Sequence, residues 1–225
     1  MTTGRQIPLS FDARPAQGRE DFLVADCNRR AVDALGRAED WPARRLALIG
    51  PPRSGKSHLA ALWTGERGGV RVDLGTLPAA EIEALAAAPV ALDVPDVPLP
   101  REETPLLHLL NRLAERDQPC LLTAREAPGR WPVALPDLAS RLAAIAVVRI
   151  DPPDDRVLGA LLVKLAADRQ MRLPPAVLDY VLRRIERSFA TAEAVVAELD
   201  RASLSAKRPV SLALAAEVLD RPAPF

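Results

Sequence analysis

Eight residues between positions 50 and 57 carry the clearest chemical signature of this chain. They read Gly-Pro-Pro-Arg-Ser-Gly-Lys-Ser, the G-x-x-x-x-G-K-[ST] pattern of a phosphate-binding loop. The two glycines let backbone amides curl around a phosphate chain, and the helix that follows adds its positive N-terminal charge. The flanking strand-like and helix-like runs favour a nucleotide site over an ordinary Gly-rich turn. The expected contacts are Gly50, Pro51, Pro52, Arg53, Ser54, Gly55, Lys56, Ser57 and His58.

Magnesium and catalysis need further polar groups beside this loop. The Ser57 hydroxyl can ligate Mg²⁺, and Asp93, at the end of an apolar run, is the acid expected to hold the ion through its water shell. Thr123 ends another apolar run and is a candidate to bond the γ-phosphate or the attacking water. Each of these two residues has a purely structural alternative at a strand end. Val94 follows Asp93 where a second acid would orient water, which predicts slow intrinsic hydrolysis.

Arg141 is the candidate for catalysis in another subunit's site. It lies in a helix that precedes the last predicted strand, so it should project from the body's edge, away from its own phosphate loop. An arginine finger in this position is worth roughly 10³–10⁵ in rate, because it neutralises charge that develops only in the transition state. A solvated surface arginine is the alternative interpretation.

The elements that position these residues follow an alternating pattern. Brief runs that are apolar on both faces predict parallel strands, and amphipathic segments between them predict covering helices, as in a doubly wound α/β sheet. The expected strands are Leu46–Ile49, Val70–Leu74, Val90–Leu92, Cys120–Thr123 and Val147–Ile150. The expected helices are Asp21–Arg37, Ser57–Glu66, Pro78–Ala88, Glu103–Arg116 and Pro136–Ala144.

After Asp151 only helices are predicted. Two prolines end the fifth strand, and Asp154 is a good helix N-cap. The expected domains are a terminal peptide (1–12), a nucleotide-binding domain (13–151) and a small all-α lid (152–225). The lid helices are expected at Asp155–Met171, Pro174–Arg187, Thr191–Ala206 and Ser211–Leu219.

Composition and charge exclude several function classes. Thirty basic and thirty acidic side chains cancel, which argues against strong non-specific binding to nucleic acid. Two cysteines give no disulfide framework, and the two histidines have no metal-ligand spacing. The sequence has neither a signal peptide nor an apolar run near the ~20 residues that span a bilayer. A cytoplasmic protein without membrane contact is expected.

The first residues form a separate feature. The segment Gln6-Ile7-Pro8-Leu9-Ser10-Phe11 is predicted to be extended, because Pro8 is incompatible with a regular helix. It is either a frayed terminus or a docking peptide whose Leu9 and Phe11 fill a pocket on a partner.

These segments together resemble the AAA+ ATPases related to the bacterial replication initiator DnaA, and more closely the Hda-type, DnaA-homologous inactivators of the alphaproteobacterial kind. The resemblance rests on the N-terminal peptide, the segment from Asp21 to Asn28, the phosphate loop, and the stretch from Trp131 to Leu142. It also includes Leu107–Asn111, Leu121–Arg125 and Leu199–Leu204, and it covers nearly the whole chain.

The resemblance implies a mechanism. Hda-like proteins hold ADP, are loaded on DNA by the sliding clamp, and press an arginine finger into ATP-bound DnaA, whose hydrolysis limits re-initiation. Arg141 matches the finger, and contact with DNA would be only indirect. The resemblance also implies an adenine pocket reached by the segment with Leu23 and Val24, and ADP or ATP with Mg²⁺ held through Ser57 and Asp93. The residues that match the anchors to the clamp (its β subunit) are Gln6, Ile7, Leu9 and Phe11.

Three positions depart from the family's pattern. Val94 replaces a second acid, the lid arginine aligns with Ala190, and the polar group after the fourth strand aligns within Thr123–Arg125. Arg187 is a candidate substitute for the lid arginine. The alternative functions are a DnaA-related initiator or helicase loader and a self-sufficient P-loop enzyme such as a small-molecule kinase. Which nucleotide is bound, and whether the protein is a homodimer, stay open.

Overall fold

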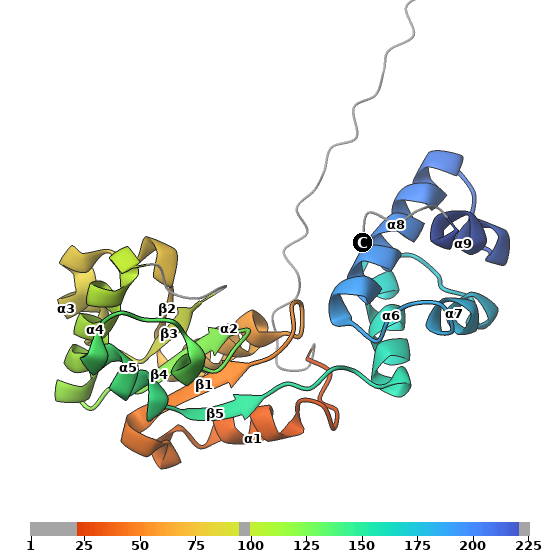
Figure 1. The fold of residues 1–225 in the computed structure, drawn as a ribbon. Helices are drawn as coiled ribbons and strands as arrows, with labels where there is room; N and C mark the ends of the chain where they lie inside the picture. Colours follow the sequence, from red (N-terminus) through yellow and green to blue (C-terminus); the bar gives the residue numbers. More distant parts are fainter. Residues whose placement is uncertain (1–21, 95–99, 221–225) are drawn as a thin grey trace, which may run out of the picture.

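The body of the protein is built on a parallel β-sheet. The computed structural model describes residues 22–94 and 100–220. Within these residues five strands pair in the order β2-β3-β4-β1-β5, every pair parallel (Figure 1). The central strands β1 and β4 are buried along their whole length, because helices cover both faces. The strands are β1 (Arg45–Ile49), β2 (Val70–Asp73), β3 (Val90–Asp93), β4 (Cys120–Ala124) and β5 (Ala146–Arg149).

Two groups of helices cover the two faces of this sheet. On one face, Leu106 and Leu138 join Leu92 and Leu122 in one core, whereas on the other Leu59 and Trp63 pack with the residues of β1 that face that side. The first face is covered by α3 (Ile82–Leu85), α4 (Pro100–Glu115) and α5 (Pro136–Ala143), and the second by α1 (Arg29–Gly36) and α2 (Lys56–Arg67). Short 3₁₀ turns are η2 (Ala38–Asp40), η3 (Pro42–Arg44), η4 (Leu74–Thr76), η5 (Ala79–Glu81) and η6 (Pro128–Arg130).

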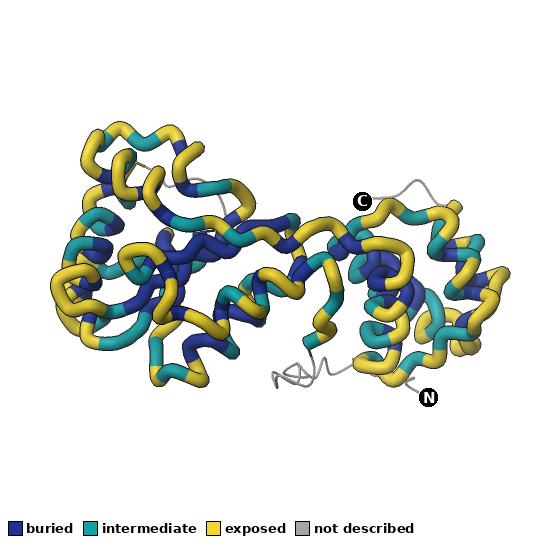
Figure 2. The backbone as a smooth tube through the Cα atoms, turned by 90° about the horizontal axis from the view of Figure 1, so that it is seen from below, coloured by how far each residue is buried: buried dark blue, intermediate teal, exposed yellow. Residues whose placement is uncertain are grey.

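The residues after β5 form a separate helical lobe, which we call the lid. Its helices enclose a core of their own, and the buried backbone of body and lid is dark blue in Figure 2. The side chains of Asp154, Ser188 and Ser211 accept a backbone N–H at the starts of three lid helices and so fix where they begin. The helices are α6 (Asp155–Asp168), α7 (Pro175–Leu182), α8 (Phe189–Ala206) and α9 (Leu212–Leu219).

The expected five-stranded parallel sheet with helices on both faces and a helical C-terminal region is confirmed. The helix expected over 21–37 is wrong in its first part, since α1 begins only at Arg29. There the Asn28 side chain donates to the Leu23 carbonyl and accepts from the Ala25 N–H, both at 2.8 Å, and so holds a non-helical turn. No helix among the described residues is long and apolar enough to cross a membrane. The expected docking peptide lies outside the described residues.

Candidate nucleotide site

The phosphate loop joins the carboxyl end of β1 to the first residue of α2. Gly50 passes so close to the neighbouring chain that a Cβ would lie 2.9 Å from the Ile150 carbonyl oxygen. Gly55 has φ +88°, a left-handed conformation that favours glycine, and a Cβ there would lie 2.7 Å from the Phe22 ring. Both pattern glycines are therefore required by the backbone path. The loop presents the N-terminus of a twelve-residue helix to its concave side.

Lys56 reaches back over this loop. Its Nζ donates to the carbonyl oxygens of Gly50 and Pro51, at 2.9 and 2.8 Å. Burial lowers the pKa of Lys56, Asp93 opposes that shift, and Arg125 adds to it. The ammonium is thus desolvated beside further charged groups, a setting in which it interacts strongly with a phosphate.

Asp93 is the centre of a polar cluster at the carboxyl edge of the sheet. Its Oδ2 accepts from the Ser57 hydroxyl at 3.0 Å, and its Oδ1 accepts from the Thr123 hydroxyl at 2.6 Å. The guanidinium of Arg71, on the edge strand β2, lies 3.8 Å from Oδ2. The Ser57 hydroxyl and the Asp93 carboxylate lie side by side and offer the oxygen ligands that Mg²⁺ prefers. These two residues therefore fit a Mg²⁺ ion that arrives with a nucleotide. No group of three or more acidic, His or Cys side chains in the described part of the chain forms a protein-only metal site.

Val94 lies on the other side of the strand from this cluster. Its side chain is buried in the core, and its N–H donates to the Thr123 carbonyl at 2.8 Å. A buried isopropyl group cannot accept a proton from water. The position after Asp93 therefore supplies no base.

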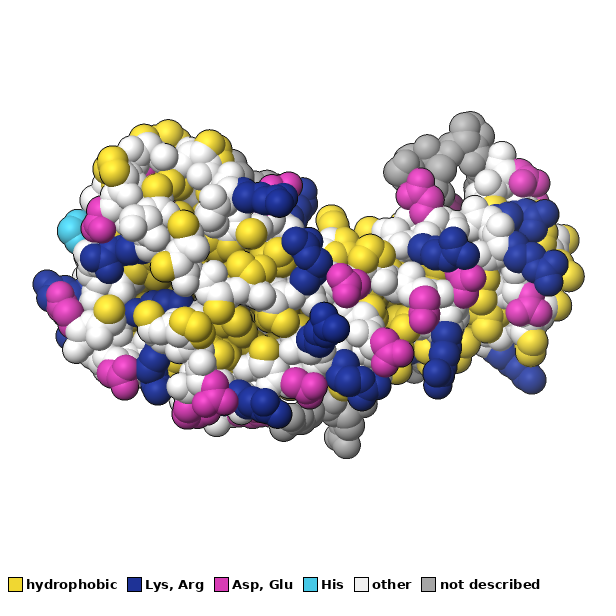
Figure 3. Space-filling view, turned by 60° about the horizontal axis from the view of Figure 1, so that its bottom comes forward, with side chains coloured by type: hydrophobic (Ala, Val, Ile, Leu, Met, Phe, Trp, Pro, Cys, Tyr) yellow, Lys and Arg dark blue, Asp and Glu magenta, His cyan; other side chains and the backbone are white. Residues whose placement is uncertain are grey.

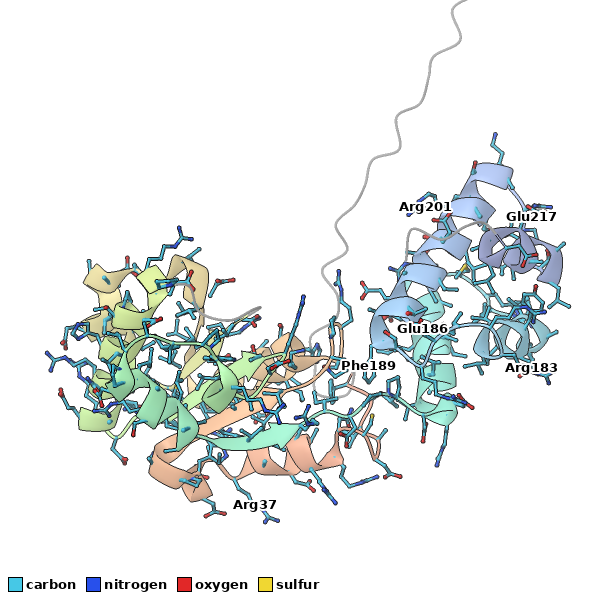
Figure 4. All side chains as sticks on the ribbon, viewed as in Figure 1. Arg37, Arg183, Glu186, Phe189, Arg201 and Glu217 are labelled. Carbon is cyan, nitrogen blue, oxygen red and sulfur yellow. The ribbon has the colours of Figure 1, made fainter. Side chains whose placement is uncertain are left out.

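A cleft of ≈240 Å³ opens between the phosphate loop and the lid. Figure 3 shows the notch that separates the two lobes, and Figure 4 shows Phe189 at the end of the lid that faces the body. The body and the N-terminal segment line the cleft with Phe22, Leu23, Asn28, Arg53, Ser54, Gly55 and His58, and the lid lines it with Val157, Leu161, Lys164, Leu165, Asp168 and Phe189.

Two polar atoms on this cleft have no hydrogen-bond partner within the described residues. They are the Oγ of Ser54, a residue with only 4% of its surface exposed, and the Nε2 of His58. The His58 ring stacks on Phe22 with its centroid 5.5 Å away. Buried polar atoms are rarely left unpaired, so a polar group of a ligand or an ordered water is expected beside each of these two atoms.

The lid contacts the body through charged groups of its own. The Arg53 guanidinium lies 3.4 Å from the Glu193 carboxylate on α8. Arg187, the candidate substitute for the lid arginine, instead makes two hydrogen bonds to Asp155, at 2.7 and 3.0 Å. Ala190 lies in the first turn of α8 and offers no charge. The lid group that meets Arg53 is therefore a carboxylate, and Lys164 in the same cleft is paired with Asp168 at 2.8 Å.

Arg141 lies far from its own phosphate loop. Arg141 lines a pocket together with Arg45, the first residue of β1. The phosphate loop begins at the other end of this strand, directly after Ile49. The Arg141 side chain is 43% exposed, and its Nε lies 3.3 Å from the carboxylate of Asp137. The guanidinium is thus available at the surface.

The fold brings most of the sequence-derived candidates together. The loop residues, Asp93 and Thr123 share one edge of the sheet, and Leu23 lines the cleft. Val24 does not line it, but faces a crevice between α1 and α2. The sequence interpretation missed Phe22, Arg71 and the cleft-lining residues of the lid. Phe189 is an aromatic residue two positions before the helix start expected at Thr191, and that position was a signal that could have identified it.

Comparisons with known proteins agree with this geometry. Residues 154–219 match the family model for the lid domain of Hda. Domain III of the replication initiation protein DnaA from Thermotoga maritima superimposes with a TM-score of 0.75 at 19% identity, covering 92% of this chain and 96% of that one.

Two further solved structures share the fold. AMPPCP-bound DnaA from Aquifex aeolicus has a TM-score of 0.63 at 17% identity, over 79% of this chain and 63% of that chain. The RuvB Holliday junction branch migration motor of Thermotoga maritima has a TM-score of 0.66 at 15% identity, over 91% and 72%. The expected resemblance to Hda-like, DnaA-homologous AAA+ proteins, and the AAA+ fold itself, are confirmed.

Proposed function

We propose that this protein is a nucleotide-binding regulator of DnaA, which stimulates hydrolysis of DnaA-bound ATP through Arg141 and so limits re-initiation of replication. The observation that carries the proposal is that the phosphate loop and Arg141 lie at opposite ends of the central strand β1. A complete phosphate loop lies at the carboxyl end of β1, and an exposed arginine lies at its amino end. One surface grips a nucleotide, and the opposite surface is free to serve another subunit's nucleotide.

The proposed ligand of the cleft is ADP or ATP. Support comes from the orphaned polar atoms of Ser54 and His58, and from the bound AMPPCP of the Aquifex DnaA structure. Ser57 and Asp93 would hold Mg²⁺, which supplies charge neutralisation at the phosphates when bound. Lys56 binds the phosphate chain, and Thr123 orients the Asp93 carboxylate.

Slow turnover by this site follows from Val94. The residue after Asp93 cannot act as a general base for water, because the Val94 side chain is apolar and buried in the core. A regulator that works with bound ADP needs its nucleotide site and the arginine finger Arg141, but it does not need to hydrolyse ATP itself. The protein is proposed to reach DnaA by binding the sliding clamp. The residues of this chain that would bind the clamp are Gln6, Ile7, Leu9 and Phe11. The proposed location is the cytoplasm.

The test measures hydrolysis of DnaA-bound ATP in the presence of DNA-loaded clamp. Arg141→Ala should reduce the stimulation by at least about 10³-fold, since a finger acts only on the transition state. Arg37→Ala, at an exposed arginine on the underside of the body in Figure 4, is the control and should stimulate normally. Full stimulation by the Arg141→Ala protein would overturn the proposal. A pull-down with Gln6→Ala tests recruitment to the clamp separately.

A further inference from the structure

Arg71 is a charged residue beside Asp93 to which the proposed function gives no role. It projects from β2, the edge strand of the sheet, and its side chain is 40% exposed. The parallel register pairs Asp73 with Asp93, so Arg71 lies two residues back along the neighbouring strand. From there its Nη2 reaches to 3.8 Å from the Asp93 Oδ2 atom.

The Asp93 carboxylate does not need this partner to satisfy its hydrogen bonds. Thr123 already donates to Oδ1 and Ser57 to Oδ2. An exposed ion pair adds little to folding stability, and Arg71 is therefore poorly explained as a structural residue. Its position matters for another reason: it approaches the same oxygen that faces Ser57.

That oxygen is where a divalent cation would lie if the proposed function is correct. Mg²⁺ between Ser57 and Asp93 would be close to the guanidinium of Arg71, and like charges at this separation repel. Without Mg²⁺, the Arg71 guanidinium stays beside Asp93, at the carboxyl edge of the sheet where the phosphate loop lies. Lys56 is desolvated in the same neighbourhood, so the site holds positive charge before any metal arrives.

We propose that Arg71 is a built-in cation of the nucleotide site, which competes with Mg²⁺ for Asp93 and partly takes its place beside the phosphates. The inference rests on the proposed nucleotide binding and deepens it. Its consequence is that this chain holds ADP with only a weak requirement for Mg²⁺. A switch of this kind retains its nucleotide when the metal is depleted.

The test is calorimetric titration of the full-length protein with ADP, once with excess Mg²⁺ and once with EDTA. The measured quantity is the Kd in EDTA divided by the Kd in Mg²⁺. Arg71→Gln should raise this ratio about threefold to tenfold, the size expected for one unit charge a few ångströms from phosphate in a partly exposed site. Arg71→Lys, which keeps the charge, should stay within about twofold of the wild type.

Arg37→Gln makes the same change of net charge at an exposed position outside the site and should leave the ratio unchanged. Thermal melting shows that each variant is folded. If wild type binds ADP and Arg71→Gln gives the same ratio as wild type, the role of Arg71 is wrong while the proposed function stands. If the wild type binds no ADP in either buffer, the proposed function fails and this inference fails with it.

Discussion

Arg53 in the phosphate loop pairs with Glu193 in the lid, with 3.4 Å between the guanidinium Nη1 and the carboxylate Oε1. Arg53 has φ 62°, so a left-handed turn in the loop presents its side chain toward the lid. The contact is made between two protein side chains, whereas the lid arginine that the resemblance led us to expect would reach for phosphate. The lid of this chain is therefore tied to the loop by an interaction that needs no nucleotide.

Glu193→Ala tests this tie. Loss of the pair should increase the radius of gyration measured by small-angle scattering, because this ion pair joins α8 directly to the loop. The free energy of unfolding should change by less than about 1 kcal/mol, since both side chains are partly exposed. Glu198→Ala is the matched control, because that carboxylate pairs with Arg201 inside the lid. Identical scattering from the two variants would contradict the assignment.

Lys56→Ala tests the grip on phosphate. The ammonium is the charge held over the loop, and a charge-assisted hydrogen bond contributes about 1.5–3 kcal/mol. We expect ADP affinity to fall by about tenfold to a hundredfold, measured by calorimetry. The melting temperature without nucleotide is measured beside it, because this variant also loses the two hydrogen bonds to the Gly50 and Pro51 carbonyls. Wild-type affinity in this variant would show that the nucleotide binds elsewhere.

The same lysine predicts a pH dependence. Burial lowers the pKa of Lys56 from its ordinary 10.5, and phosphate binds only the charged form. ADP affinity is therefore complete below this lowered pKa and is lost as the pH rises through it, earlier than for an exposed lysine. Binding should take up protons in alkaline buffers, as calorimetry in buffers of different ionisation enthalpy can measure. The Lys56→Ala protein should show no such uptake.

Glu103 positions the segment that leads into α5 and Arg141. Its buried carboxylate accepts the N–H groups of Ala134 and Leu135, at 2.9–3.0 Å. Glu103→Ala should cost about 3 kcal/mol in urea unfolding and speed hydrogen exchange at these two amides. Glu115→Ala removes only exposed pairing with Arg112 and should cost less than about 1 kcal/mol. Unchanged exchange in the Glu103 variant would refute this support of α5.

The two thiols should differ sharply in reactivity. Full burial raises the pKa of Cys120 to about 11, and partial burial raises that of Cys27. Since only the thiolate reacts, Ellman's reagent near pH 8 should modify Cys27 slowly and Cys120 only when the protein unfolds. In Cys27→Ser the native-state reaction should disappear. A native-state reaction that survives this substitution would mean that β4 opens locally.

Much of the fold was accessible from sequence. The positions of all five strands were predicted to within one or two residues. The central strands β1, β3 and β4 are brief and apolar because helices cover both faces, and the edge strands β2 and β5 are marked by their valines. The phosphate loop was equally accessible, because its backbone path requires glycine at positions 50 and 55. The helix predicted over 21–37 was too long, since periodicity does not reveal that the Asn28 side chain bonds the preceding backbone.

The sequence by itself determined the chemistry of the loop, the alternation of strands and helices, and the absence of an acid at Val94. The tertiary structure alone decided which polar groups meet. Ser57 and Asp93 are 36 residues apart, and strand order and register bring them to 3.0 Å. The tertiary structure also places Arg71 beside Asp93 and Glu193 beside Arg53. Such contacts depend on packing between distant segments, which no local pattern of residues encodes.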